Sequence, residues 1–233
     1  MVDEMNILFE AIKSKNLEKV IGAMPKVDIN EQDQFGRTSL HYVIVKKAPI
    51  EIFKELLAFG AKTGITDRLH ESVLTKAIKF NNKQAVKCLI ENGVELNHSA
   101  GIKKTPWFLA RHNPEIADLL LETKGAIRLK LTESEQAIID GCLYGESAEV
   151  NVYLTQLNTL ELLHAFVLHF NWDDDLQLMK MVLQHANCQE ITAIEMFDLV
   201  DGDYWLNQGD SSDEEREYVD FVQHLLRRFP NIL

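Results

Sequence analysis

The amino-acid sequence predicts an all-α protein in which short helix pairs stack into a solenoid, followed by a smaller helical domain. Three observations predict this fold. Apolar residues recur at helical spacing along most of the chain, one local pattern returns about every 33 residues, and that period ends near Thr159. An apolar fraction of 46% over 233 residues also suits a folded protein rather than a disordered one.

The repeated pattern is clearest from Asp33 to Ala61. It starts with Asp33-Gln-Phe-Gly-Arg-Thr-Ser-Leu-His, where a glycine suits a tight turn and Thr38 suits the start of a helix. A second helix ends in Leu-Leu-Ala-Phe-Gly-Ala. The unit resembles the ankyrin repeat, whose Thr-Pro-Leu-His box is matched by Thr38-Ser39-Leu40-His41. The resemblance implies a protein-binding fold and a structural role for His41 at the turn between neighbouring units.

The spacing of equivalent residues supports the repeat. Thr38 and Ser72 are 34 residues apart, Ser72 and Thr105 are 33 apart, and Gly60 and Gly93 are 33 apart. Three successive intervals therefore agree with a repeat of about 33 residues. The box histidine is replaced by a threonine in the second copy and by a phenylalanine in the third, which leaves the period unchanged.

Both ends of the array have a helix-pair pattern without the complete box. Residues 6–24 are predicted to form an N-terminal capping repeat whose second helix stops at Pro25. Residues 132–157 read as a degenerate last pair, or as an adaptor that closes the stack, and start with the capping box Thr132-Glu-Ser-Glu135. We therefore place the ankyrin repeats at residues 1–157 and an acidic helical domain at residues 158–233.

The C-terminal domain is predicted to contain helices over residues 160–170, 174–184, 191–200 and 214–229. Asn171-Trp-Asp-Asp-Asp175, Asn187-Cys188 and Asp201-Gly202 resemble the motifs of a small bacterial domain family of uncharacterised function, over roughly residues 160–206. Asp175 stands where that family has glycine, and Gln189 stands where it has aspartate. The resemblance implies a bacterial protein from a genomic neighbourhood rich in polymorphic toxins, where immunity proteins are found.

The charge of the chain is concentrated in its second half. Residues 1–126 hold 18 Lys and Arg against 16 Asp and Glu, a net +2, and residues 127–233 hold 6 against 20, a net −14. The two parts sum to −12. This balance argues against a nucleic-acid ligand, because phosphate binding needs an excess of Lys and Arg. A basic protein partner, or simple solubility, fits the acidic charge better.

Other patterns limit where the protein is located and what chemistry it performs. No apolar run is long enough to span a membrane and the chain starts without a secretory signal, so we expect a cytoplasmic protein. Three widely spaced cysteines predict buried thiols rather than disulfides or a zinc site. No cofactor is predicted. We expect Asp173 or Asp174 to cap the following helix and Asp201-Gly202 to form a turn, rather than to bind a metal.

Two surfaces are candidates for binding the partner, and the sequence leaves open which of them makes the contact. One is the concave face of the repeats, lined by Tyr42, Lys46, Lys76, Lys79, Phe80 and Arg111. The other is the acidic domain, with Asp173, Asp174, Asp175, Asp203, Tyr204 and Trp205. The sequence thus favours a bacterial immunity protein that binds a cognate, basic toxin domain without catalysis. The alternatives are an effector or scaffold that uses the concave face, and a metal-dependent hydrolase that uses residues such as His164 and Asp201.

Overall fold

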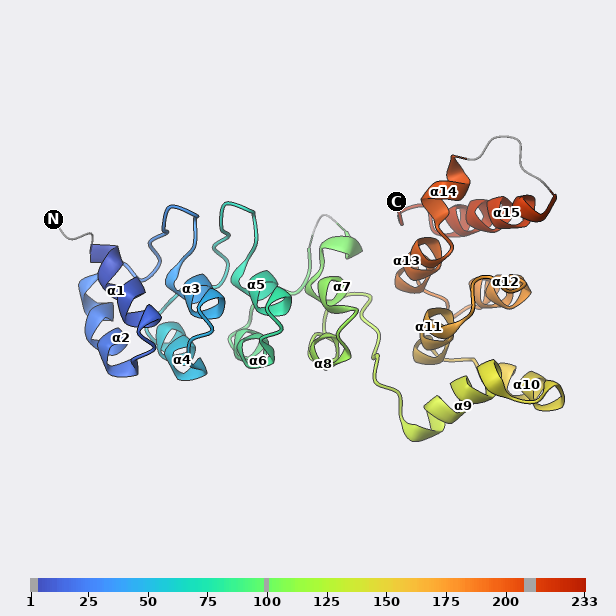
Figure 1. The fold of residues 1–233 in the computed structure, drawn as a ribbon, viewed down its shortest axis with the longest axis horizontal. Coiled ribbons are helices and arrows are strands. Elements are labelled where there is room, and N and C mark those ends of the chain that lie inside the picture. The colour runs from blue at the N-terminus through green and yellow to red at the C-terminus, as the bar shows by residue number, and fades with distance from the viewer. Residues whose placement is uncertain (1–3, 99–100, 208–212) are drawn as a thin grey trace. The chain divides into compact units, whose positions relative to one another are not determined.

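The computed structural model describes residues 4–98, 101–207 and 213–233, and this part of the chain is built from helices (Figure 1). The described residues form no strand, and one isolated backbone bridge joins Thr66 to Ser72. The all-α class predicted from the sequence is therefore confirmed. The chain divides into two compact units, residues 1–124 and residues 125–233, which we call the repeat unit and the C-terminal unit.

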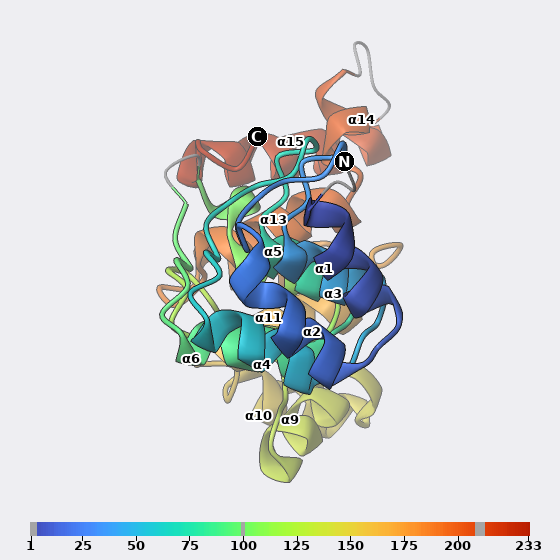
Figure 2. The ribbon, with the colours of Figure 1, turned by 90° about the vertical axis from the view of Figure 1, so that its left-hand side faces the viewer.

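The repeat unit is a stack of helix pairs. An inner row is formed by α1, α3, α5 and α7, each packed on the next, and an outer row by α2, α4, α6 and α8 (Figure 1). Figure 2 views the first pair from the N-terminal side. The helices are α1 (Glu4–Lys13), α2 (Leu17–Ala23), α3 (Ser39–Val45), α4 (Ile50–Ala58), α5 (Val73–Lys79), α6 (Lys83–Glu91), α7 (Pro106–Ala110) and α8 (Pro114–Ala117), with 3-10 turns at Met24–Lys26 and Ile102–Lys104.

Each inner helix after the first starts at the hydroxyl residue that defines the repeat period. Ser72 Oγ accepts a hydrogen bond from Thr75 N at 3.1 Å, and Thr105 Oγ1 accepts one from Phe108 N at 3.3 Å. Thr38 forms the same cap as part of a capping box with His41. These bonds satisfy main-chain N–H groups that the first turn of a helix leaves free, so the repeated box sets where each helix begins.

His41 also joins two repeats. Its Nδ1 accepts from Thr38 N at 3.3 Å, so Nε2 carries the ring proton and donates to the main-chain oxygen of Glu71 at 3.1 Å. Burial lowers the pKa of His41 and keeps the ring neutral, as this arrangement requires. The structural role predicted for His41 is in agreement with these contacts.

Further hydrogen bonds between repeats follow the sequence period. Asn30 Oδ1 accepts from Lys62 N at 2.7 Å, and Asn113 Nδ2 donates to Asn81 Oδ1 at 2.8 Å, in each case across 32 residues. Polar contacts at this interval, as well as apolar packing, therefore fix the position of one helix pair relative to the next. The largest fully buried side chains of this unit include Ile12, Leu40, Phe53, Leu74, Leu89 and Trp107.

The C-terminal unit is itself built from packed helices, although the 33-residue period has ended. Its helices are α9 (Glu133–Tyr144), α10 (Ser147–Leu154), α11 (Leu160–His169), α12 (Gln177–Gln184), α13 (Glu190–Leu199), α14 (Gly202–Leu206) and α15 (Asp213–Arg228). α9 packs on α10 and α11, α11 packs on α13, and α13 packs on α14 and α15. Successive members of the row α9, α11 and α13 begin 27 and 30 residues apart.

The predicted capping box at the start of α9 is present, with Thr132 Oγ1 accepting from Glu135 N and Glu135 accepting from Thr132 N. α9 and α10 lie within the C-terminal unit, whereas the sequence groups them with the repeats. The division of the chain into domains at residues 157 and 158 stays a prediction.

The C-terminal unit is held together around α13, whose residues from Ile191 to Phe197 are all buried. Arg228, near the end of α15, donates to the main-chain oxygens of Leu183 and His185, the latter at 2.8 Å. Those oxygens belong to the last turn of α12, where a cation is favourable. Arg228 therefore fastens the terminal helix to the end of α12.

Candidate interaction surfaces

Five of the six residues predicted on the repeats lie at corresponding places along the inner row of helices. Lys46, Phe80 and Arg111 are the C-cap residues of α3, α5 and α7, which pack side by side. Tyr42 lies one turn before the first of these caps, and Lys79 is the last residue of α5. We call these five residues the inner-helix row.

Tyr42 is fixed by its surroundings and is half-buried. Its ring meets the Phe9 ring edge to face, with centroids 4.6 Å apart. The Arg37 guanidinium and Lys46 Nζ lie 5.3 Å and 5.2 Å from the centre of the same ring. Such cation–π contacts orient the cations, so this end of the row presents an ordered group of an aromatic ring and two positive charges.

The rest of the inner-helix row is more open. Phe80 is 41% exposed, and Lys79 is exposed while pairing with Glu71. The Arg111 guanidinium lies 3.9 Å above the Phe108 ring and donates to the Phe108 main-chain oxygen at 3.2 Å. The row therefore offers one accessible aromatic side chain between basic groups.

Lys76, which the sequence also assigns to this face, is a structural residue instead. Its side chain is only 10% exposed, and Nζ lies 2.9 Å from Asp67 Oδ2 while also pairing with Glu71. Burial disfavours the charged amine, but the bonds to the two carboxylates outweigh burial and raise the pKa of Lys76. The assignment of Lys76 to the binding face is therefore wrong, because loop carboxylates hold its amine.

In the first two complete repeats, the aspartate that folds the loop pairs with cations from different places. In the first, the Asp33 carboxylate accepts from the N–H groups of Phe35 and Arg37 and pairs with the Arg37 side chain at 2.6 Å. In the second, Asp67 accepts from the N–H groups 2 and 4 residues later and pairs with a lysine on the helix. Arg37 of the first repeat corresponds in position to Glu71 of the second, and Tyr42 corresponds to Lys76. The cation that pairs with the loop aspartate therefore lies on the loop in the first repeat and on the helix in the second.

Two exposed residues on the loops between repeats were not predicted. Phe35 is 54% exposed and Leu69 is 72% exposed, each lying two residues after the aspartate that folds its loop. The loops adjoin, because the N–H of Arg68 donates to the main-chain oxygen of Phe35 at 3.0 Å. The sequence offers one sign of these exposed residues: a large apolar residue occurs at the same place in two successive turns, where polar residues are expected.

In the C-terminal unit, the predicted acidic residues follow the ends of two neighbouring helices. Asp173, Asp174 and Asp175 are exposed in the loop after α11, and Asp203 is exposed in α14, just after α13. We call these four residues the acidic edge. Asp173 and Asp174 do not cap the next helix as predicted, since α12 begins at Gln177 without a side-chain cap. Asp175 instead accepts from Gln177 N at 2.8 Å.

Two tryptophans anchor the acidic edge in the same way. Trp172 Nε1 donates to the Val167 main-chain oxygen at 3.2 Å, and Trp205 Nε1 donates to the Val200 main-chain oxygen at 2.8 Å. Each indole thus folds back five residues onto the end of the helix before it. Trp172 is half-buried.

Tyr218 of α15 joins the two parts of the acidic edge. Its ring stacks on Trp205 with centroids 4.9 Å apart, and its hydroxyl lies 3.5 Å from the main-chain oxygen of Trp172. Tyr204, 48% exposed, meets the other side of this group edge to face with Trp205 at 4.8 Å. Tyr218 therefore links the loop after α11 to the helix after α13.

The helix dipoles act on this edge in both directions. Its carboxylates follow the C-termini of α11 and α13, where a helix dipole favours cations, but Asp175 precedes α12 and Asp203 lies in the first turn of α14, where it favours anions. Several cations of the unit are engaged internally: Arg128 pairs with Glu135 at 2.6 Å, Lys180 pairs with Glu217 at 2.7 Å, and Arg228 binds main-chain oxygens. Residues 127–233 hold 6 Lys and Arg against 20 Asp and Glu, so this part of the chain is strongly acidic.

The Asp-Gly motif after α13 is explained by packing. Asp201 adopts the left-handed conformation, with φ 57°, and precedes α14. A side chain on the buried Gly202 would place a Cβ 2.4 Å from the Phe197 ring. Glycine is therefore required for α14 to approach α13, and the predicted turn at this motif is present.

The remaining candidates for chemistry are structural. His164 is 2% exposed, its Nδ1 lies 3.1 Å from Thr192 Oγ1, and burial lowers its pKa to about 4. Cys88, Cys142 and Cys188 are buried, as predicted. Among the described residues, no group of three or more His, Cys, Asp and Glu side chains is placed to hold a metal ion. In the described chain, no helix has the length and apolar character needed to cross a membrane.

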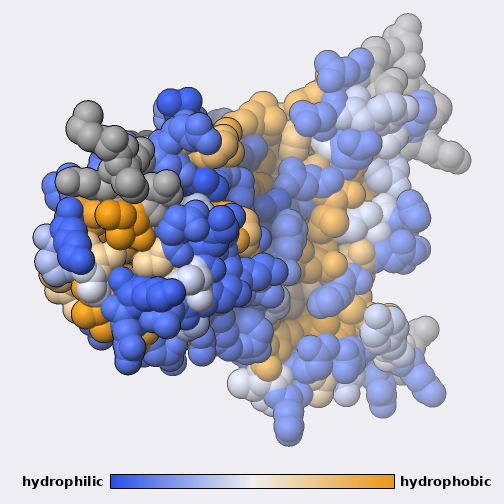
Figure 3. Space-filling model, turned by 60° about the vertical axis from the view of Figure 1, so that its left-hand side comes forward, coloured by the Kyte–Doolittle hydropathy of each residue, from blue (hydrophilic) through white to orange (hydrophobic). Residues whose placement is uncertain are grey.

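Both units expose hydrophobic residues among hydrophilic ones, as the view in Figure 3 shows. Among the hydrophobic residues described in the repeat unit, the loop residues Phe35 and Leu69 have the highest exposed fractions. In the C-terminal unit Tyr204 and Leu206 are exposed beside the acidic edge. Each candidate surface thus combines charge of one sign with accessible apolar groups, the composition that protein interfaces use.

Comparison with known families agrees with the two units. The model for "Ankyrin repeats (3 copies)" matches residues 8–98 and 43–132, which together span more than half of the chain. The model for "Domain of unknown function (DUF4274)" matches residues 158–230. No curated protein matches the chain. Ankyrin repeats are a non-catalytic, protein-binding fold. The chain therefore belongs to the ankyrin-repeat family, and it carries a DUF4274 domain after the repeats.

Proposed function

We propose that this protein is a bacterial immunity protein that binds and neutralises a cognate, basic toxin domain through the acidic edge of its C-terminal unit. The observation that carries the proposal is the exposure of Asp173, Asp174, Asp175 and Asp203 in the two segments, after α11 and after α13, that Tyr218 links. These exposed carboxylates belong to a part of the chain with 6 Lys and Arg against 20 Asp and Glu, so they offer a cationic partner a surface of one sign.

The charge and the aromatic residues of this edge suit different parts of the binding process. Exposed carboxylates raise the association rate with a cationic surface and reject partners of the wrong charge. Tyr204 and Trp205, held against Tyr218, supply aromatic side chains whose burial gives lasting affinity. Neutralisation then needs only that the toxin's working surface be covered, without turnover.

The direct test is to co-express this protein with the toxin domain encoded beside its gene and to measure binding by calorimetry. Charge reversal of Asp173, Asp174 and Asp175 to lysine is expected to weaken binding about tenfold or more. A matched control reverses Glu51, Glu55 and Glu91, three exposed carboxylates of the repeat unit, and makes the same change in net charge. Equal effects of the two triple variants would show that only net charge matters and would reject the acidic edge.

A second candidate is a scaffold or effector that binds its partner through the inner-helix row and the loop tips. The exposed Phe35, Leu69 and Phe80 favour it, because apolar residues accessible beside cations suit an acidic partner. Replacing these three residues with alanine would then abolish binding, while charge reversal at the acidic edge would leave it unchanged. The opposite pattern of effects supports the immunity role.

A further inference from the structure

The loops that precede α3, α5 and α7 repeat one feature that the acidic edge does not explain. We call the four residues before the hydroxyl residue that starts each of these helices a tip segment, which gives residues 34–37, 68–71 and 101–104. The second residue of each tip segment is large and apolar, namely Phe35, Leu69 and Ile102. An apolar side chain therefore recurs at one place in three successive repeats.

The first two tip segments adjoin at one edge of the repeat unit. Figure 1 shows their loops rising from the same edge, before α3 and α5. The N–H of Arg68 donates to the main-chain oxygen of Phe35 at 3.0 Å, and a Cβ on Gly36 would lie 2.7 Å from the same nitrogen. Phe35 and Leu69 are more than half exposed, whereas Ile102 is half-buried before α7, which packs on α5. Apolar side chains thus protrude from loops that lie together.

The charge that these loops expose is positive. Arg68 and Lys104 are both exposed in their tip segments. The carboxylates of the first two loops are instead held inside by ion pairs, with 13%, 3% and 13% of the side chain exposed for Asp33, Asp67 and Glu71. The tip segments therefore present apolar groups beside cations, a surface that fits an anionic partner.

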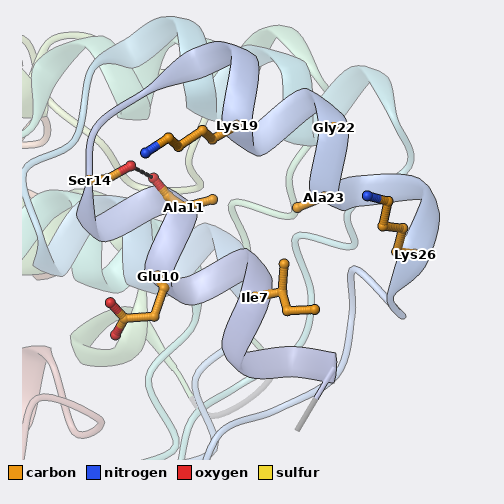
Figure 4. Close-up of a pocket in the computed structure, with 8 residues that line it drawn as sticks. All are labelled: Ile7, Glu10, Ala11, Ser14, Lys19, Gly22, Ala23 and Lys26. Carbon is orange, nitrogen blue, oxygen red and sulfur yellow. Dashed lines mark hydrogen bonds between the residues drawn. The ribbon is translucent and has the colours of Figure 1, made fainter. Parts of the chain in front are cut away.

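The end of the helix array offers a contrast. A hollow of about 630 Å³ is lined by α1 and α2, and Figure 4 shows charged side chains of both signs around it, those of Glu10, Lys19 and Lys26. A surface that mixes the two signs does not select a partner by its charge. The tip segments expose one sign, so their charge does select the partner.

The residues of the tip segments vary while their character is kept. The apolar place holds a phenylalanine, a leucine and an isoleucine, so it keeps hydrophobicity but not shape. The cations change place, since Arg68 lies four residues before Ser72 and Lys104 lies directly before Thr105. A protein pocket needs matched shapes and fixed charge positions, whereas an anionic lipid surface needs neither. The variation therefore favours a lipid surface over a protein.

We propose that the tip segments bind the repeat unit to the surface of an anionic lipid bilayer. Phe35 and Leu69 enter the interfacial layer, while Arg68 and Lys104 stay at the level of the negatively charged headgroups. Each contact is weak, so binding is reversible and needs several tips at once. The same surface repels the strongly acidic C-terminal unit, which confines contact to the repeat unit. This inference is independent of the proposed immunity role.

The test is flotation of the full chain with lipid vesicles, which measures the fraction of protein that rises with the lipid. We expect binding to vesicles of equal parts phosphatidylcholine and phosphatidylglycerol, little binding to phosphatidylcholine alone, and loss of binding at high salt. Phe35→Ser with Leu69→Ser is expected to weaken binding about tenfold or more, because both apolar groups are lost. Phe59→Ser is the control, since this exposed phenylalanine lies at the C-cap of α4 in the outer row.

A second pair of variants tests the charge. Arg68→Gln with Lys104→Gln is expected to weaken binding to the mixed vesicles about tenfold or more. Lys19→Gln with Lys26→Gln removes the same charge beside the hollow in Figure 4 and should leave binding unchanged. Thermal unfolding of every variant verifies that a loss of binding does not come from an unfolded repeat unit.

The proposal is overturned if the chain does not float with the mixed vesicles, if it floats equally with neutral ones, or if both tip variants float as well as their controls. Polyglutamate tests the other class of anionic partner. If it binds the tip segments while vesicles do not, the tips serve an acidic protein instead. Binding of the toxin domain is measured separately with the same variants, so either proposal can fail alone.

Discussion

The ring of Tyr218 stacks on the indole of Trp205, with an interplanar angle of 18° and centroids 4.9 Å apart. This contact connects α15 to the short helix that follows α13. Tyr218→Ala is expected to lower the free energy of unfolding by about 2 kcal/mol, because both the apolar burial and the aromatic contact are lost. Urea denaturation followed by tryptophan fluorescence measures this change.

Tyr218→Phe is the matched variant for that experiment. It keeps the stacked ring and removes only the hydroxyl, which lies 3.5 Å from the Trp172 oxygen. We expect a loss of about 0.5 kcal/mol or less, since a long and partly exposed hydrogen bond contributes little. If the two variants lost equal stability, the hydroxyl rather than the ring would be the connection.

Gly202→Ala is expected to destabilise the C-terminal unit by about 1–3 kcal/mol, because the added methyl group would meet the Phe197 ring and force one of the two helices to move. Gly64→Ala is its control, since a Cβ there meets nothing within 4 Å. Thermal unfolding of the two variants gives the comparison. Unchanged stability of Gly202→Ala would mean that Phe197 can turn aside freely.

Lys76→Met should cost about 3 kcal/mol, because it leaves the buried Asp67 carboxylate without its cation. The double variant Glu71→Arg with Lys76→Tyr transfers the arrangement of the first repeat, where Arg37 pairs with Asp33 beside Tyr42. We expect it to recover most of that loss in chemical denaturation. A double variant as unstable as the single one would show that the two repeats are not interchangeable.

The stability of the C-terminal unit should fall as the solution becomes acidic. Burial lowers the pKa of His164 from 6.5 to about 4, so between these values the unfolded chain binds a proton that the folded chain excludes. Stability is complete above about pH 6.5 and is lost as the pH falls through about 4, by roughly 3 kcal/mol. Urea titrations at several pH values test the slope, and His112→Gln, which removes an exposed ring, should leave it unchanged.

The sequence predicts the repeats well because their signals are local. The hydroxyl residue that starts each inner helix, the box histidine and the apolar spacing each act within one helix pair. The C-terminal helices follow from the same apolar spacing, although α12 starts three residues later than predicted. The five-residue helix α14 was missed, because it is too short to show a period and depends on the contact between Gly202 and Phe197.

The side-chain environment of the candidate sites was harder to predict. Lys76 has the spacing of a surface residue, and only the folded loop shows that Asp67 and Glu71 reach its amine. The exposure of Phe35 and Leu69 depends on how two loops 34 residues apart lie together. The acidic edge could be recognised from its composition, but its link through Tyr218 depends on a helix more than 40 residues further along the chain.

The placement of the three tryptophans provides a built-in optical probe. Trp107 is 1% exposed inside the repeats, whereas the indoles of Trp172 and Trp205 border the acidic edge. A protein that docks on that edge would alter the emission of the latter two while leaving the buried one as a constant background. Unlabelled protein can therefore report which of its two halves a partner touches.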